Sequence, residues 1–217
     1  EALLSVYQSG DGNASSIHSE GQTARRQLEA ARRKIANYIG ANATEIVFTS
    51  GGTESNNLAI LGLIRAQRLA NPNRRIHVMT TAIEHPSVLE AVRQLSRMAN
   101  IDTTYIDPDP SGVVNATAIQ KALRPETVLI SCMHANNETG AIQPIPEIAA
   151  VVQQARCNGQ DIHLHVDGVQ ALSKIPFHVV ELGADLYSMS AHKVHALKGT
   201  GALYIRKGVA IQPLQFG

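Results

Sequence analysis

Short apolar segments alternate along this chain with segments of helical periodicity, and this alternation limits the fold more than any other feature. The segments that we expect to be strands are residues 45–49, 75–80, 102–106, 127–133, 162–166, 185–188 and 201–205. Most are separated by expected helices, at 54–70, from Pro86 onward, near 116–123 and at 145–157. Such alternation builds a mostly parallel sheet with helices on both faces, so the predicted fold class is α/β.

A further helix is expected before the first strand. Ser19 and Gln22 have the spacing of a capping box, and Gly40 is placed to end the helix. Between these signals, apolar residues recur at helical spacing at Leu28, Ala31, Ile35 and Ile39.

The composition excludes several classes of protein. The chain has 217 residues and a formal net charge of +1, without a basic run, so no nucleic-acid partner is expected. No apolar stretch is long enough to span a membrane and no signal peptide begins the chain, so no membrane is expected. Two cysteines, Cys132 and Cys157, make no disulfide framework, and we expect a reducing, cytoplasmic compartment.

Ligands of parallel α/β sheets bind at the carboxyl ends of the strands, so these ends are the places to search for a site. The strand 45–49 leads into Ser50-Gly-Gly-Thr-Glu-Ser55, where a helix begins. This sequence is neither a P-loop nor a dinucleotide fingerprint. A glycine-rich turn at a helix N-terminus offers backbone N–H groups to a phosphate, although a simple tight turn would need the same small residues.

Two further strand ends carry polar residues with more than one interpretation. The strand 75–80 is followed by His85, which could cap the next helix or take part in chemistry. The strand 127–133 is followed by the polar segment 134–140, which could be a hydrogen-bonded turn or part of a site.

The last two strand ends carry opposite charges. Asp167 directly follows the strand 162–166, which we expect to be buried, and a carboxylate there requires a cation or hydrogen-bond donors. Lys193 follows the strand 185–188 and its polar extension. An amine, a carboxylate, the flat ring of His85 and a phosphate-binding turn are the four parts that pyridoxal phosphate requires, so the sequence predicts a site for that cofactor.

Six stretches, in this order and spacing, also carry a family resemblance. They are Gly12-Asn-Ala-Ser-Ser-Ile-His18, Phe48-Thr-Ser-Gly-Gly-Thr-Glu-Ser-Asn-Asn57, Glu84-His85, Met133-His-Ala-Asn-Asn-Glu-Thr-Gly140, His165-Val-Asp-Gly-Val-Gln170, and Ser190-Ala-His-Lys193 with Lys198-Gly199. The chain resembles the NifS/IscS-like cysteine desulfurases and selenocysteine lyases of the class V aminotransferase group. The resemblance implies that residues 1–217 are the large cofactor-binding domain of a fold type I enzyme, incomplete at its N-terminus and without the small C-terminal domain.

The resemblance implies roles for individual residues around the cofactor ring. Lys193 would hold pyridoxal phosphate as a Schiff base and later move a proton. Asp167 would pair with the pyridine nitrogen, and Gln170 would bond the phenolic oxygen. His85 would stack on the ring and is a second candidate for proton transfer, while Asn136 would contact the ring or the substrate.

The resemblance also implies a phosphate site and a reaction. The phosphate would be held by Gly52, Thr53, Ser190 and His192. The implied reaction converts L-cysteine to L-alanine and leaves the sulfur on an enzyme cysteine, from which it passes to an acceptor protein. That cysteine belongs to the absent C-terminal domain, since neither Cys132 nor Cys157 matches it by motif. A homodimer is implied as well, with sulfur metabolism and iron–sulfur cluster assembly as the context.

The sequence departs from the family pattern at two of these motifs. The usual Ser-Gly-His-Lys-x-Tyr-Gly-Pro-Lys-Gly appears here as Ser190-Ala-His-Lys-Val-His-Ala-Leu-Lys-Gly199, and Asp-Ala-Thr-Gln appears as Asp167-Gly-Val-Gln170. These changes bear on loop geometry and substrate preference, and they leave the Schiff-base lysine in place.

Three alternatives stay open at the level of sequence. A selenocysteine lyase or another class V aminotransferase would share Lys193 and Asp167. A fragment that serves only for interaction would need no chemistry. The alternation of His163, His165 and Asp167 along one strand face would also allow a metal site, although the cofactor interpretation already uses Asp167 and predicts no metal.

Overall fold

The computed structural model describes residues 12–216, and the chain forms two compact units that divide between Ile46 and Val47. The expectation that residues 1–217 are one large domain, with a smaller domain elsewhere, stays a prediction. The cofactor-site residues expected from the sequence all lie in the second unit.

The first unit is built around α2 (Ser19–Ile39). Its N-cap residue is His18, whose Nδ1 accepts a hydrogen bond from the Gly21 N–H at 3.4 Å. The predicted capping box is therefore wrong, and the Gln22 side chain donates instead to a backbone carbonyl. Gly40 ends the helix in the left-handed conformation, with φ 72°, as predicted.

The apolar residues of α2 are only partly buried. Ile39 is buried and Ile35 half-buried, whereas Leu28 and Ala31 are exposed. The short 3-10 helix η1 (Ala43–Glu45) follows and leads into the first strand.

The described residues contain one sheet of seven strands in the order β1-β7-β6-β5-β4-β2-β3. The strands are β1 (Ile46–Thr49), β2 (Ile76–Thr81), β3 (Ile101–Ile106), β4 (Thr127–Met133), β5 (His163–Asp167), β6 (Leu186–Ser190) and β7 (Gly201–Ile205). From β3 to β6 all neighbours are parallel, and β7 pairs antiparallel with β6. The mostly parallel sheet is thus confirmed, and each expected strand is found with ends that differ by at most two residues.

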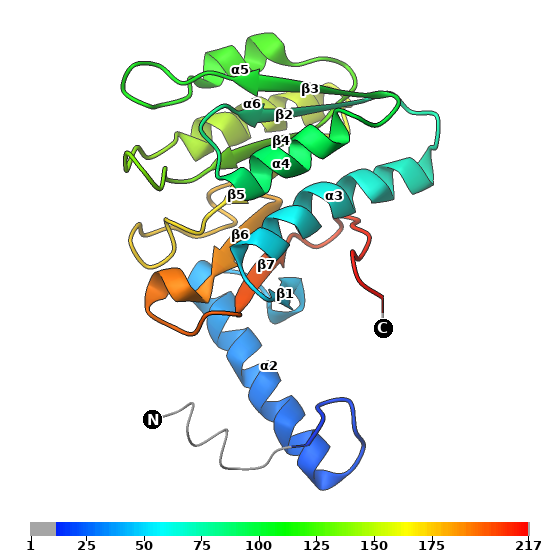
Figure 1. The fold of residues 1–217 in the computed structure, drawn as a ribbon, viewed down its shortest axis with the longest axis vertical. Helices are drawn as coiled ribbons and strands as arrows, with labels where there is room; N and C mark the ends of the chain where they lie inside the picture. Colours follow the sequence, from blue (N-terminus) through cyan, green and yellow to red (C-terminus); the bar gives the residue numbers. More distant parts are fainter. Residues whose placement is uncertain (1–11, 217) are drawn as a thin grey trace. The chain divides into compact units, whose positions relative to one another are not determined.

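Helices cover both faces of the sheet, as predicted (Figure 1). On one face lie α3 (Gly52–Ala70) and α4 (Pro86–Leu95), and on the other α5 (Ala116–Ala122) and α6 (Ile145–Cys157). The apolar side of α3 packs into the core together with β2 and α4. Because α3 begins at the carboxyl end of β1, this packing fixes the helix N-terminus at the edge of the sheet.

A buried polar row crosses the sheet beneath α3. The His165 ring lies between two serines, with Nδ1 2.8 Å from Ser131 Oγ and Nε2 3.0 Å from Ser188 Oγ. Burial lowers the pKa of His165 to about 3, so the ring is neutral and one serine accepts while the other donates. Both ring nitrogens are therefore already engaged, which leaves none for a metal ion.

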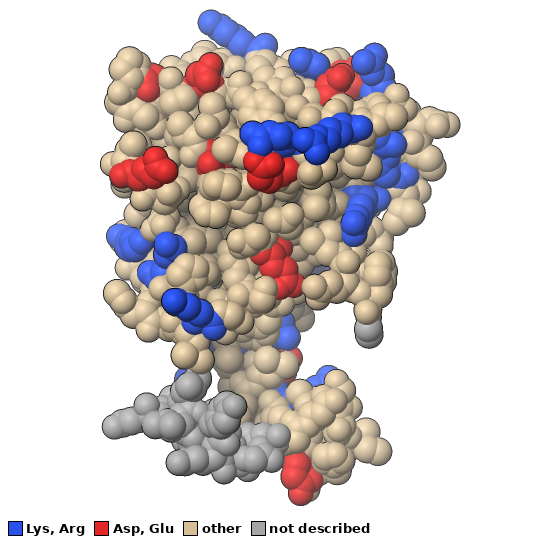
Figure 2. Space-filling view, in the orientation of Figure 1, with Lys and Arg blue, Asp and Glu red and all other residues tan. Residues whose placement is uncertain are grey.

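The surface carries both signs of charge. On the face shown in Figure 2, Lys and Arg side chains are scattered among Asp and Glu and uncharged residues. Among residues 12–216, no helix combines the length and the apolar character that a membrane span requires.

Candidate active site

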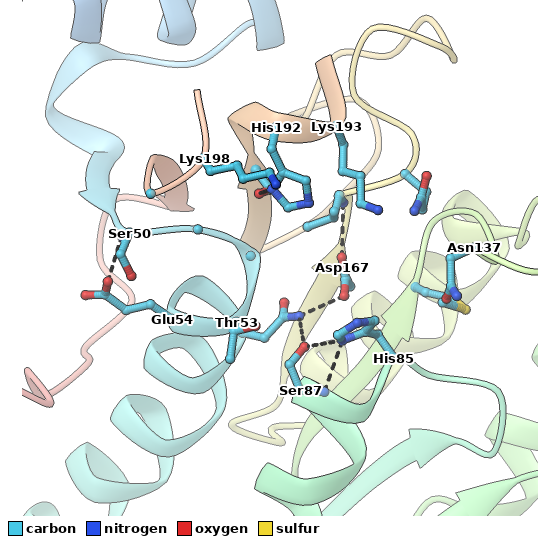
Figure 3. Close-up of a pocket in the computed structure, with 18 of the residues that line it drawn as sticks. Ser50, Thr53, Glu54, His85, Ser87, Asn137, Asp167, His192, Lys193 and Lys198 are labelled. Carbon is cyan, nitrogen blue, oxygen red and sulfur yellow. Dashed lines mark hydrogen bonds between the residues drawn. The ribbon is translucent and has the colours of Figure 1, made fainter. Parts of the chain in front are cut away.

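A cavity of about 460 Å³ lies where the segments that follow β1, β2, β4, β5 and β6 meet (Figure 3). This is the edge of the sheet at which the sequence predicts a site. Eight of the nine predicted site residues line the cavity: Gly52, Thr53, His85, Asp167, Gln170, Ser190, His192 and Lys193.

The turn between β1 and α3 provides a place for an anion. Gly51 has φ 154°, which side chains rarely allow, and Gly52 begins the helix. A Cβ on Gly52 would lie 2.7 Å from Cγ2 of Val169, so any other residue here would require the Val169 side chain to move. The backbone N–H groups of a first helical turn have no partner within the helix and carry the positive end of its dipole. The turn therefore fits a phosphate group.

Asp167, the last residue of β5, is only 5% exposed. Its Oδ2 accepts a hydrogen bond from Asn56 Nδ2 at 2.7 Å, and its Oδ1 accepts one from the Val169 N–H at 3.0 Å. Burial raises the pKa of this carboxyl despite the two hydrogen bonds. The sequence predicts donors for a buried acid here, and both donors are present. A cationic ring nitrogen in the cavity would stabilise the charged form further.

A hydrogen-bond network joins Asp167 to His85. Asn56 Nδ2 donates both to Asp167 and, at 2.8 Å, to Ser87 Oγ. Ser87 Oγ in turn lies 2.8 Å from Nδ1 of His85 (Figure 3). The carbonyl oxygen of the Asn56 side chain is buried and lacks a hydrogen-bond partner. One amide thus fixes the acid and, through a serine, the imidazole.

His85 both caps a helix and lines the cavity. As the N-cap residue of α4, its Nδ1 accepts a hydrogen bond from the Ser87 N–H at 3.1 Å. A nitrogen that accepts this bond carries no proton, so the proton of the neutral ring is on Nε2. The two interpretations of His85 left open by the sequence are therefore compatible.

Glu84, next to His85, is a second buried acid beside the cavity. Its Oε1 accepts hydrogen bonds from Thr81 Oγ1 at 2.6 Å and from the Met133 N–H at 2.7 Å. Burial, with the nearby charge of Asp167, raises its pKa to about 8. The protonated carboxyl therefore joins the end of β2 to the end of β4.

Lys193 lies in the 3-10 helix η2 (Ala191–Val194), which follows β6 directly. Its side chain is exposed and lines the cavity. In the same segment, His192 Nδ1 lies 2.9 Å from Ser190 Oγ, which places both beside the glycine turn. Gln170 also lines the cavity and accepts a hydrogen bond from Lys174 at 2.8 Å.

Asn136 is the one predicted site residue that does not line the cavity. Its Nδ2 donates to the Ile83 carbonyl at 3.1 Å, and its Oδ1 accepts from the backbone N–H groups of Glu138 and Thr139. The amide is therefore used to shape its own turn. Asn137, the next residue, lines the cavity instead.

Several cavity residues were not expected from the sequence, namely Asn56, Ser87, Asn137 and Lys198. Asn56 is four residues after Gly52 and so lies on the same side of α3, a spacing that could have indicated it. Ser87 has no comparable signal, since its role follows from the capping geometry of His85.

Neither cysteine lies in the cavity. Cys132 is fully buried in β4, and burial raises the pKa of its thiol well above the usual value. Cys157 is exposed at the C-terminal end of α6, just before β5 begins, and so lies at the opposite edge of the sheet. Residues 12–216 also contain no group of three or more His, Cys, Asp or Glu side chains that could hold a metal ion.

The sequence matches the aminotransferase class-V family over residues 1–217. The chain belongs to this family. Among curated class-V relatives, it is 46% identical over 217 residues to the cysteine desulfurase IscS of Dictyoglomus turgidum (strain DSM 6724 / Z-1310) and 42% identical over 217 residues to that of Methanosarcina thermophila. These alignments cover 100% of this chain and 52% and 51% of the relatives, so the chain spans about half of their length.

Solved structures of class-V proteins share the fold. The structure of SspA in complex with cysteine has a TM-score of 0.88 and 39% identity, over 95% of this chain and 57% of that one. A NifS-like protein has a TM-score of 0.88 and 40% identity, over 95% and 54%. The fold is that of the fold type I enzymes, and the family depends on pyridoxal phosphate. The buried Asp167, the glycine turn and the amine of Lys193 in one cavity fit that cofactor.

Proposed function

We propose that this chain forms the cofactor-binding part of a pyridoxal-phosphate-dependent cysteine desulfurase. The single observation that carries the proposal is the convergence of Lys193, Asp167 and the turn Gly51–Thr53 on one cavity. The names of the relatives support the desulfurase reaction over other class-V reactions, as does the cysteine bound in the structure of SspA. Bound pyridoxal phosphate supplies an electron sink for bonds at the substrate α-carbon.

In this proposal, Lys193 and Asp167 act on different parts of the cofactor. Lys193 Nζ would hold the cofactor covalently and, as a free amine, would accept or donate a proton at its own nitrogen. Asp167 keeps a proton on the pyridine nitrogen, because a buried carboxylate is stabilised by a cation at this place. Gln170 hydrogen-bonds the phenolic oxygen.

His85 and the residues around the phosphate orient the cofactor. His85 would stack on the ring; its Nδ1 accepts a hydrogen bond from the Ser87 N–H, so its Nε2 would carry the proton available for transfer. Gly52, Thr53, Ser190 and His192 hold the phosphate. We retain Asn136 as a residue that shapes the ring or substrate side of the site, through its turn.

The sulfur transfer itself requires a thiol from outside residues 1–217. L-cysteine and an enzyme thiol give L-alanine and an enzyme persulfide, with the carbon–sulfur bond of the substrate broken and a sulfur–sulfur bond formed. The persulfide sulfur then passes to an acceptor protein. A homodimer in a reducing, cytoplasmic compartment is part of the same proposal.

The test uses the full-length protein. Wild type is expected to show the visible absorption band of protein-bound pyridoxal phosphate, and Lys193→Ala is expected to lose the band. Lys193→Ala with an unchanged band would contradict the central assignment. Alanine and sulfide formed from cysteine, compared with the products from selenocysteine, then distinguish a desulfurase from a selenocysteine lyase.

A further inference from the structure

A second lysine of the cavity, Lys198, has no role among those implied by the family motifs. It lies in the loop between β6 and β7 and lines the same cavity as Lys193. Among the described residues that line the cavity, these two are the only lysine or arginine side chains. Since Lys193 is assigned to covalent attachment, Lys198 provides the remaining ammonium group.

The loop that carries Lys198 is held against the glycine turn. The N–H of Ala191 donates to the Thr200 carbonyl at 3.0 Å, which closes the loop at its base. At the same base, Gly201 lies so close to Gly51 that a Cβ on Gly201 would be 2.6 Å from the Gly51 Cα. The backbone around residue 200 and the anion turn are thus in direct contact, and Lys198 is only a few residues from this contact.

The charge at this end of the cavity is otherwise unfavourable for a phosphate. Glu54 also lines the cavity, and its Oε2 accepts a hydrogen bond from the Ser50 N–H at 2.7 Å. The hydrogen bonds with Ser50 lower the pKa of Glu54, so this carboxylate is charged at neutral pH. A phosphate in the turn would meet this negative charge, which an ammonium group that also lines the cavity would offset. Lys198 and His192, which is assigned to the phosphate, both line the cavity (Figure 3).

We propose that the ammonium group of Lys198 binds the cofactor phosphate and makes the site selective for the phosphorylated form of pyridoxal. The inference rests on the proposed function, because its ligand is the cofactor of that function. The other anion that could reach Lys198 is the carboxylate of an amino-acid substrate, and the experiment separates the two.

The test is a titration of the full-length protein, freed of cofactor, with pyridoxal phosphate and with pyridoxal, followed by visible absorption. Because a hydrogen bond to a charged group is among the stronger ones, Lys198→Gln should raise the Kd for pyridoxal phosphate about tenfold or more. The Kd for pyridoxal, which has no phosphate, should stay within about twofold of wild type, since a change below that corresponds to only a few tenths of a kcal/mol. Lys198→Arg keeps the charge and should restore most of the affinity. Lys121→Gln, at an exposed lysine on α5, is the matched control and should change neither Kd.

Each other outcome counts against the inference. An unchanged Kd for pyridoxal phosphate in Lys198→Gln would overturn it while leaving the proposed function intact. A raised KM for cysteine with an unchanged cofactor Kd would assign the ammonium group to the substrate carboxylate. Equal losses for both aldehydes would show damage to the loop and not a phosphate contact. Wild type that binds neither aldehyde would overturn the proposed function, and this inference with it.

Discussion

A Cβ atom on Gly168 would lie 2.0 Å from Cε1 of Tyr187, so the tyrosine ring fills the space that any side chain at position 168 would need. Tyr187 is fully buried, with its ring centroid 4.7 Å from that of Phe177 and its hydroxyl 2.9 Å from His134 Nδ1. Gly168 follows Asp167, and His134 opens the turn after β4. One tyrosine therefore packs against two of the segments that form the cavity, and it leaves no room here for the alanine that is usual in the family.

Gly168→Ala should destabilise the protein by about 1–3 kcal/mol, because the added methyl group overpacks a buried site. Urea unfolding of the full-length protein measures this. In the double variant Gly168→Ala with Tyr187→Val, the smaller side chain should remove most of that added cost, so the two changes should not be additive. If the losses in the free energy of unfolding simply added, the contact with Tyr187 would not restrict the side chain at position 168.

Tyr187→Phe should lower the free energy of unfolding by about 1 kcal/mol, since it leaves the buried His134 Nδ1 without its hydrogen-bond partner. Burial lowers the pKa of His134 to about 4, so the ring is neutral when it makes this bond. The comparison is best made near pH 7, where the histidine is neutral in both states. A variant as stable as wild type would show that the hydroxyl contributes only packing.

Glu84→Gln should remove a pH dependence of stability. The carboxyl has a folded-state pKa of about 8 and an ordinary value of 4.5, so the folded state binds one more proton between these values. The free energy of unfolding therefore falls as pH rises toward 8, by up to about 1.4 kcal/mol per pH unit from this group.

Above about pH 6.5, the pH dependence due to Glu84 can be measured without that of the buried histidines. Burial lowers the pKa of His77 and His134 to about 4 and that of His165 to about 3, so their contributions are lost as pH falls below 6.5, the opposite sign. Urea unfolding between about pH 6.5 and 8 should give a falling stability for wild type and a flatter profile for Glu84→Gln. If the stability of wild type and of Glu84→Gln changed with pH in the same way, a group other than Glu84 would bind this proton.

Asp167→Asn should separate stability from cofactor chemistry. An asparagine at this position keeps one acceptor oxygen in place of two, so either the Val169 N–H or Asn56 Nδ2 loses its acceptor, and the free energy of unfolding should fall by about 1–3 kcal/mol while the protein stays folded. Activity of the full-length enzyme should fall at least about a hundredfold, since the ring nitrogen loses its charged partner. Asp161→Asn, at a more exposed acid outside the cavity, is the control and should retain activity. Full activity in Asp167→Asn would contradict the assigned role.

The fold could be predicted where the hydrophobic periodicity of a segment agrees with the residues that end it. The strand 127–133 and the helix 145–157 have the expected ends, because the strand is mostly apolar and the helix stops at Asn158 and Gly159. The capping box at Ser19 failed because the neighbouring His18 side chain can make the same capping bond. Such competition between adjacent residues is decided by local geometry that the spacing does not contain.

The site could be predicted to a similar depth. The rule that ligands bind at carboxyl ends of strands was sufficient to select Asp167 and Lys193, and both line the cavity. It could not decide between Asn136 and Asn137, which are adjacent in one polar turn. Only the backbone path shows that the first amide folds inward to hold the turn and the second reaches the cavity.

Because β6 pairs antiparallel with β7, Lys193 lies on a different kind of segment from Asp167 and His85. Because Ser190 of β6 lies opposite Gly201 of the antiparallel strand β7, residues 191–200 form the tip of a hairpin. Asp167 and His85 instead lie where parallel strands lead into the connections that cross over the sheet. A hairpin tip can change in sequence without repacking the layers beneath it. The proposed attachment point Lys193 and the proposed phosphate contact Lys198 are thus carried together on this hairpin tip, so exchanging residues 191–200 between relatives would replace both amines at once while keeping the acid and the anion turn unchanged.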